Sequence, residues 1–156
     1  MYKTKNDLPE KIRNQAIEIL NVNLASSVDL MHQAKQAHWN VKGATFIALH
    51  KLFDEIVDAV EEYMDLIAER VVQLGGIAEG TIQNAAKRST LKEYPVISDE
   101  VDHVEVLSAA LATYGKNVRR AIDQTDELGD RDSADIFTEI SRGTDKYLWF
   151  VEAHLG

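Results

Sequence analysis

One apolar repeat in the first half of the chain constrains the fold more than any other feature of the sequence. Between residues 46 and 74, apolar side chains recur in steps of three and four, and Gly75-Gly76 then ends the pattern. The residues of this repeat are Phe46, Leu49, Phe53, Ile56, Val60, Tyr63 or Met64, Ile67, Val71 and Leu74. The spacing predicts a long helix with one apolar side, which must be buried against other helices.

The segment before this repeat predicts another long helix. It begins after Asp7, because Asp7 and Glu10 have the spacing of a capping box and Pro9 lies in the first turn. Apolar residues at helical spacing continue to about Trp39, and residues 40–45 then interrupt the pattern. These two helices therefore form a hairpin with a short turn.

The second half of the chain predicts a second pair of helices. Residues 98–100 begin a helix that runs to about Ile122, because a serine and two acidic residues are typical of a helix N-terminus. An acidic loop follows, and the last helix runs from near Asp132 to the C-terminal Gly156.

A long connection separates the two pairs of helices. Residues 77–97 contain Gly80 and Pro95 with only a weak apolar pattern, which indicates a crossover that carries one short helix. Connections that are short, long and short are typical of the ferritin-like four-helix bundle. We therefore expect an all-α, ferritin-like bundle as a single domain, residues 1–156, with residues 1–7 as a short leader.

The composition limits both the chemistry and the setting. The chain has 156 residues and no cysteine, so imidazole and carboxylate groups would have to bind any metal, which favours iron or manganese. We expect a cytoplasmic protein, because no segment resembles a membrane span and residues 1–11 lack the apolar core of a signal peptide. The net charge of −9 repels nucleic acid and anionic membranes, so binding to a polyanion would have to be local.

Two pairs of residues of the types that bind metal lie on the helix predicted between residues 46 and 74. His50 and Asp54 are four residues apart, as are Asp65 and Glu69, so each pair lies on one face. The step from Asp54 to Asp65 is close to three whole turns, so the pairs share a face but lie about 16 Å apart along the axis. One chain cannot place both pairs around the same ion.

A two-fold axis between two chains would allow both pairs to reach the same ion. If two copies of the helix lie antiparallel, His50 and Asp54 of one chain face Asp65 and Glu69 of the other. The spacing therefore predicts a dimer with a metal site shared between two chains.

The same geometry places the axis and adds a ligand. The midpoints of the pairs put the axis close to Ala59 and Val60, with two identical sites about 22 Å apart. A turn near Ala44 brings His38 to the height of His50, which makes His38 a fifth ligand. Two imidazoles and three carboxylates can hold two ferrous ions with positions open for an oxidant, and zinc or manganese would compete.

Each half of this site also has a simpler interpretation. Acidic residues on a helix usually form a solvated face, and His50 beside Leu49 and Leu52 fits a partly buried histidine. A helical scaffold without chemistry is therefore an alternative. Under it, replacing His50 or Asp65 would change neither iron oxidation nor metal content.

Several runs of residues, spread over nearly the whole chain, match the pattern of a known family. The runs are Lys35-Gln36-Ala37-His38-Trp39-Asn40, Gly43-Ala44-Thr45-Phe46, Leu49-His50, Asp65, Ile67-Ala68-Glu69-Arg70, Leu74-Gly75-Gly76, Leu91, Tyr94-Pro95, Asp145-Lys146 and Leu148-Trp149-Phe150. This pattern resembles the Dps mini-ferritins, the DNA-protecting proteins of starved cells, most specifically in the first half of the chain.

The resemblance implies a ferroxidase. A hollow shell of twelve subunits would oxidise ferrous iron, usually with hydrogen peroxide, store the ferric mineral inside and limit oxidative damage. His38, His50 and Asp54 would come from one subunit, whereas Asp65 and Glu69 would come from its mate and hold the tighter iron.

Two further assignments follow from the resemblance. Trp39 corresponds to an aromatic residue beside the iron centre, which either donates an electron or simply packs in the hairpin. The acidic stretch before the last helix is similar to the region that lines the three-fold pore, where rings of carboxylates would draw ferrous ions inward. This similarity gives Asp126, Asp130 and Asp135 as pore residues, with Asp132 as the helix cap.

DNA binding is the alternative function. Many Dps proteins carry a lysine-rich disordered tail that binds phosphates, whereas only Lys3 and Lys5 precede the first helix here. A nucleoid-associated protein that compacts DNA is therefore the second hypothesis, disfavoured by the short tail. It would depend on avidity, with weak contacts from Lys3, Lys5, Lys11 and Arg13 repeated around the cage.

The remaining histidines are not expected to bind metal. Glu100 and His103 have the Glu-x-x-His spacing of larger di-iron bundles, but those bundles need two copies and this chain has one. His32 should face away from His38, and His154 lies in the last turn, where a histidine suits the helix dipole.

Overall fold

The computed structural model describes residues 2–156 and contains, over that range, five helices and no β-strand. The helices are α1 (Glu10–Asn40), α2 (Phe46–Gln73), α3 (Ile82–Arg88), α4 (Glu100–Glu127) and α5 (Arg131–Glu152). The expected all-α bundle, with a short helix in the crossover, is confirmed. None of the described helices is both long enough and apolar enough to cross a membrane.

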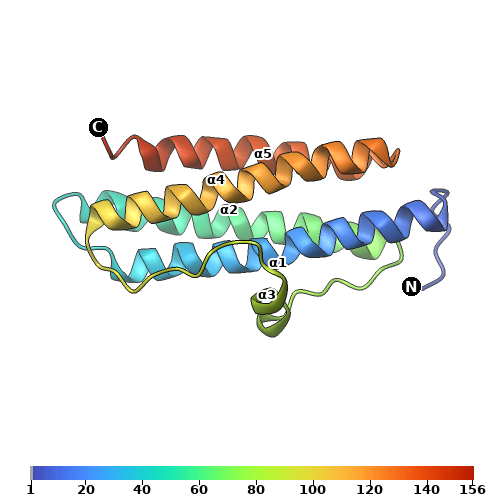
Figure 1. The fold of residues 1–156 in the computed structure, drawn as a ribbon, viewed down its shortest axis with the longest axis horizontal. Coiled ribbons are helices and arrows are strands. Elements are labelled where there is room, and N and C mark those ends of the chain that lie inside the picture. Colours follow the sequence, from blue (N-terminus) through green and yellow to red (C-terminus); the bar gives the residue numbers. More distant parts are fainter. Residues whose placement is uncertain (1) are drawn as a thin grey trace.

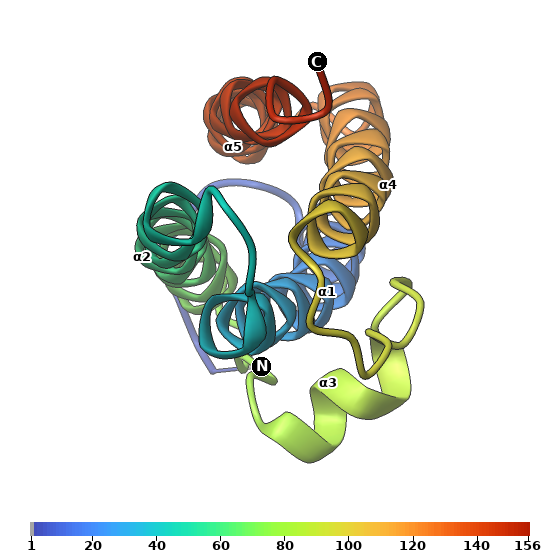
Figure 2. The same ribbon diagram turned by 90° about the vertical axis from the view of Figure 1, so that its left-hand side faces the viewer.

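The four long helices form a bundle of two antiparallel hairpins. α1 packs on α2 and α4 packs on α5, while α1 also contacts α4 and α2 contacts α5. Figure 1 shows the crossover returning along the length of the bundle from the end of α2 to the start of α4. Viewed end-on, the four helices stand at the corners of a square, and α3 lies outside it against α1 (Figure 2).

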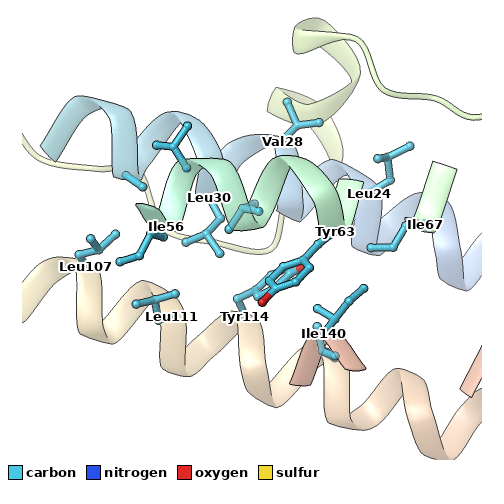
Figure 3. Close-up of a cluster of buried hydrophobic side chains, with 14 of the residues drawn as sticks. Leu24, Val28, Leu30, Ile56, Tyr63, Ile67, Leu107, Leu111, Tyr114 and Ile140 are labelled. Carbon is cyan, nitrogen blue, oxygen red and sulfur yellow. The ribbon is translucent and has the colours of Figure 1, made fainter. Parts of the chain in front are cut away.

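Large apolar side chains from all four long helices fill the core. Figure 3 shows Leu24, Ile67, Leu111 and Ile140 lining the space between the helices, where Tyr114 lies among them. Tyr114 is fully buried, and its hydroxyl lies 2.7 Å from Ser27 Oγ, which satisfies a polar group that would otherwise be costly to bury.

The contact between α2 and α5 depends on one small residue. The hydroxyl of Tyr63, which is 9% exposed, occupies the space where a Cβ atom on residue 143 would lie. Gly143 therefore lets the phenol ring lie directly against the α5 backbone.

The start of α1 differs from the sequence-based prediction. Pro9 is the N-cap residue, and no side chain accepts a hydrogen bond there, so the capping box of Asp7 and Glu10 is wrong. The leader is instead held against the end of α2. The Tyr2 N–H donates to the Gly75 carbonyl at 3.0 Å, and Arg13 donates from Nη1 to the Leu74 carbonyl at 2.9 Å.

The α4–α5 connection is shorter than predicted. α4 continues to Glu127, so most of the expected acidic loop is helix, and α5 ends at Glu152 rather than at the C-terminus. Asp130 caps α5 by accepting a hydrogen bond from the Ser133 N–H, so the prediction that Asp132 is the cap is wrong. The predicted start of α4 is confirmed, because Asp99 caps it by accepting from Val101 and Asp102.

Candidate metal centre

Two histidines face each other across the α1–α2 hairpin. His38 Nδ1 lies 2.7 Å from the His50 carbonyl, and His50 Nδ1 lies 2.9 Å from the His38 carbonyl. The two rings stack with their centroids 3.8 Å apart. The first two predicted ligands are therefore neighbours in the folded chain.

The hydrogen bonds also fix which ring nitrogen is available. A carbonyl oxygen only accepts, so each Nδ1 must carry the proton. In a neutral imidazole this leaves Nε2 with its lone pair, which is the form that binds a metal ion. Both histidines are thus held in the same metal-binding tautomer by backbone groups.

Asp54 lies beside this pair and already has a cationic neighbour. Its Oδ1 atom lies 3.9 Å from His38 Nδ1 and accepts a hydrogen bond from Lys35 Nζ at 2.6 Å. The Lys35 hydrogen bond holds the pKa of the Asp54 carboxyl below its usual value, although partial burial opposes this shift. Asp54 is therefore ionised at neutral pH, and a metal ion would have to compete with Lys35 for it.

The second predicted pair is bare. Asp65 and Glu69 are exposed on α2, and neither forms an ion pair or a side-chain hydrogen bond with another residue between 2 and 156. The nearby Arg70 does not neutralise them, because its guanidinium is buried and donates to Asp130 Oδ1 at 2.6 Å and to Ser133 Oγ at 3.0 Å. Two carboxylates thus face solvent with nothing from their own chain to bind.

In the described part of a single chain, no three side chains of His, Asp or Glu lie close enough together to hold a metal ion. The chain brings His38, His50 and Asp54 together near the turn of the α1–α2 hairpin and leaves Asp65 and Glu69 further along α2. The set of five can meet only if a second chain supplies one of the pairs. That arrangement stays a prediction.

Two neighbours of the histidines were missed by the sequence analysis. Phe46 packs against His50 with ring centroids 5.1 Å apart, and Lys35 binds Asp54. A signal for Lys35 existed, because it lies three residues before His38 and hence on the same face of the helix. Trp39, the predicted aromatic neighbour, is 66% exposed at the end of α1.

The three predicted pore residues differ in their surroundings. Asp126 and Asp135 are exposed, as pore carboxylates need to be, and Asp126 lies 3.8 Å from the Arg131 guanidinium. Asp130 is 1% exposed and bound to Arg70 and Ser133, so its carboxylate faces the interior of the bundle. Its assignment as a pore residue was wrong, because buried polar groups at a helix start are usually paired within the fold.

Glu100 and His103 make specific contacts of another kind. Glu100 Oε2 accepts hydrogen bonds from the N–H and the hydroxyl of Thr45, both at 2.8 Å. His103 is fully buried, and its Nδ1 lies 2.8 Å from the Tyr94 hydroxyl. Desolvation lowers the pKa of His103, which keeps the ring neutral. These two residues tie α4 to the hairpin turn and to the crossover, which the sequence analysis had not expected.

The comparisons with known proteins agree on one family. The sequence matches the ferritin-like domain family over residues 17–156. It is 48% identical to a DNA protection during starvation protein of Agrobacterium fabrum over 155 residues, which cover 99% of this chain and 96% of that protein.

Solved structures give the same result. The Dps protein of Mycobacterium smegmatis superposes with a TM-score of 0.94 at 31% identity, over 99% of this chain and 94% of that one. Dps from Microbacterium arborescens, solved in a high iron form, gives a TM-score of 0.88 at 32% identity over 99% of both chains.

Proposed function

The chain belongs to the Dps family of ferritin-like proteins, and on this premise we propose that it oxidises Fe(II) to Fe(III) at sites shared between two chains and stores the ferric product. The observation that carries the proposal is the locked pair of imidazoles beside Asp54, with a bare carboxylate pair further along the same helix. We propose hydrogen peroxide as the oxidant and the cytoplasm as the setting.

Each ligand has a distinct part in the proposed reaction. His38 and His50 offer Nε2 to the iron, and Asp54 supplies one carboxylate from the same chain. Asp65 and Glu69 of a second chain complete the site with two more carboxylates, which suit a hard cation such as Fe(II).

The electron balance explains why two ions are needed. One hydrogen peroxide molecule takes two electrons and two protons to become two water molecules, while two Fe(II) ions each lose one electron. A site that holds both ions together lets the oxidant be fully reduced in one place, which limits the release of hydroxyl radicals. Zinc or manganese, which accept the same ligands, would compete for the site.

We propose that the partner is a second copy of this chain, related by a two-fold axis near Ala59 and Val60 of α2. The bare pair supports this arrangement, because two exposed carboxylates that bind no cation of their own chain are available to bind an ion held by a neighbouring chain. The proposed assembly is the dodecamer implied by the Dps resemblance. In it, Asp126 and Asp135 would line an entry pore for Fe(II).

DNA compaction is the less favoured function. Lys3 and Lys5 are exposed, but the leader that carries them is hydrogen-bonded to the end of α2 through Tyr2, beside the contact that Arg13 of α1 makes with Leu74. A segment held in this way cannot extend to follow a phosphate backbone as a disordered tail does. We therefore expect no shift of duplex DNA on a gel at physiological salt.

The test of the proposed function is rapid mixing of the assembled protein with anaerobic Fe(II) and then peroxide. Ferric absorbance should rise quickly in the wild type and give a soluble product. A variant with His50→Ala and Asp65→Ala should lose the fast phase, whereas the control His32→Ala, an exposed histidine on α1, should keep it. Equal rates in all three proteins would mean that the five residues are a solvated face.

A further inference from the structure

The turn between α1 and α2 is bound to the start of α4. The Lys42 N–H donates to the Ser98 carbonyl at 2.8 Å, and Glu100 Oε2 accepts from both the N–H and the hydroxyl of Thr45. One backbone contact and one side chain thus connect residues 98–100, at the start of α4, to the residues that separate His38 from His50.

The contact is close enough to restrict the sequence of the turn. The Glu100 carboxylate lies where a Cβ atom on residue 43 would be, and Gly43 has φ of +157°. The side chain of Glu100 therefore lies directly over the backbone of the turn, and any larger residue at position 43 would push it away.

This arrangement explains why the His38 carbonyl is free to bind an imidazole. In a helix that continued past Asn40, the Lys42 N–H would donate to the His38 carbonyl. Here α1 ends at Asn40, and the Lys42 N–H is directed to Ser98 instead. The His38 carbonyl thus accepts from His50 Nδ1, which is half of the reciprocal pair that fixes both tautomers.

Glu100 fixes the other side of the pair. Thr45 is the N-cap residue of α2, but its own side chain caps nothing, and Glu100 of α4 binds its N–H and hydroxyl. The start of α2, and with it His50 one turn later, is therefore held at a set height relative to α1.

We infer that Glu100 is a positioning residue for the metal centre: by holding the α1–α2 turn, it keeps His38 and His50 in the reciprocal pairing that presents both Nε2 atoms. For the metal, this inference rests on the proposed function. The simpler alternative is that Glu100 only stabilises the start of α2. That alternative predicts a lower melting temperature on its removal but no change in the histidine tautomers or in metal affinity.

Three variants of the assembled protein separate these readings. Glu100→Ala removes both acceptor contacts, whereas Glu100→Gln keeps an oxygen that can accept them. Glu105→Ala removes an exposed carboxylate from the same helix and serves as the control for charge. We expect Glu100→Ala to weaken Co(II) binding in equilibrium dialysis about tenfold, and the other two variants to stay within about twofold of the wild type.

A second measurement does not depend on metal. In protein labelled with ¹⁵N at histidine, magic-angle-spinning NMR distinguishes an imidazole protonated at Nδ1 from one protonated at Nε2. We expect His38 and His50 to be uniformly protonated at Nδ1 in the wild type and to become mixed in Glu100→Ala. Glu100→Gln should restore the wild-type spectrum.

The outcomes are distinct. If Glu100→Ala keeps wild-type tautomers and wild-type Co(II) affinity, the inference is overturned, even if its melting temperature falls. If Glu100→Ala does not assemble, Gly43→Ala takes its place, because its Cβ atom would push the Glu100 carboxylate away. Wild-type tautomers in that variant would overturn the inference, and mixed tautomers would support it. If the wild type binds no Co(II), the proposed function fails, whereas the spectra still test the positioning.

Discussion

The two ligand pairs of α2 lie in very different surroundings. At the N-terminal pair, His50 is stacked on His38 and bonded to its backbone, and Asp54 is bound to Lys35. At the C-terminal pair, Asp65 and Glu69 are exposed, with no bonded side chain anywhere in the described part of their own chain. One half of the proposed site is built by the chain itself, and the other half is left open.

This difference teaches how a shared site can be divided between two chains. The histidine half is rigid before any ion arrives, because backbone carbonyls hold both rings and the entropy of ordering them is already lost in folding. The carboxylate half keeps two like charges in water, where their repulsion is small. Metal should therefore bind only to assembled protein and should stabilise the assembly by an amount that grows with the logarithm of the metal concentration.

The largest effect should come from the bare half. Asp65→Asn removes a carboxylate that its own chain does not use, so the helix content and melting temperature should stay near wild type. The rate of Fe(II) oxidation should fall by about 100-fold or more, measured by ferric absorbance. Glu105→Gln, which removes an exposed carboxylate from α4, is the matched control. If Asp65→Asn oxidised iron as fast as Glu105→Gln, Asp65 and Glu69 would not be a ligand pair.

Mixing variants should reveal whether the halves come from different chains. In a dimer of a His50→Ala chain with an Asp65→Asn chain, one site carries both changes and the other carries neither. Random 1:1 reassembly from unfolded chains should thus recover about one quarter of the wild-type rate, although each variant alone is inactive. A mixture as inactive as its components would place all five ligands in one chain or nowhere.

A smaller effect, of opposite sign, should come from the occupied half. Lys35→Met removes the ammonium that competes for Asp54, so Co(II) should bind about three- to tenfold more tightly. The pKa of Asp54 should return toward its usual value, because the Lys35 hydrogen bond is the main cause of its lowering. Titration calorimetry measures the Co(II) affinity. An unchanged affinity would mean that breaking the contact between Lys35 and Asp54 requires no free energy when the metal binds.

The smallest effect concerns the part of α2 that joins the halves. Burial raises the pKa of Tyr63 to about 12, so the folded protein keeps this proton more tightly than the unfolded chain, whose tyrosines titrate near pH 10. The resulting stability is complete below pH 10 and is lost as the pH rises toward 12. Between pH 9 and pH 11.5, the free energy of unfolding should therefore fall by about 1–2 kcal/mol less in Tyr63→Phe than in the wild type, as measured by urea unfolding. Parallel losses in both proteins would contradict this assignment.

The sequence predicted the long helices well and their ends poorly. The apolar repeat of α2 gives a strong signal because its buried side chains are large. In the last turns of α4 the buried residues are Ala121 and Thr125, whose small or polar side chains give little apolar signal. Acidic residues around them favoured a loop, but they lie on the exposed face of a helix. In place of the capping box, the leader turns back and Tyr2 bonds the Gly75 carbonyl, a contact between residues 73 apart in sequence that no local pattern predicts.

The site was predictable only in its ligand types. Spacing on α2 gave both pairs, and the hairpin gave His38. The carbonyl contacts that fix the tautomers depend on where α1 stops, and the Glu100 contact depends on where α4 starts. The Lys35 contact depends on how α1 packs on α2. Asp130 was misassigned for the same reason, since its partner Arg70 lies on another helix and no local pattern links the two.

The contact of Tyr63 with Gly143 has a consequence for how this chain can evolve. The phenol oxygen fills the place of a side chain at position 143, so a mutation there to any other residue should be tolerated only after position 63 has lost its hydroxyl or shrunk. The two positions, 80 residues apart, should therefore vary together among descendants of this sequence, and the order of the two changes should be fixed, with residue 63 changing first.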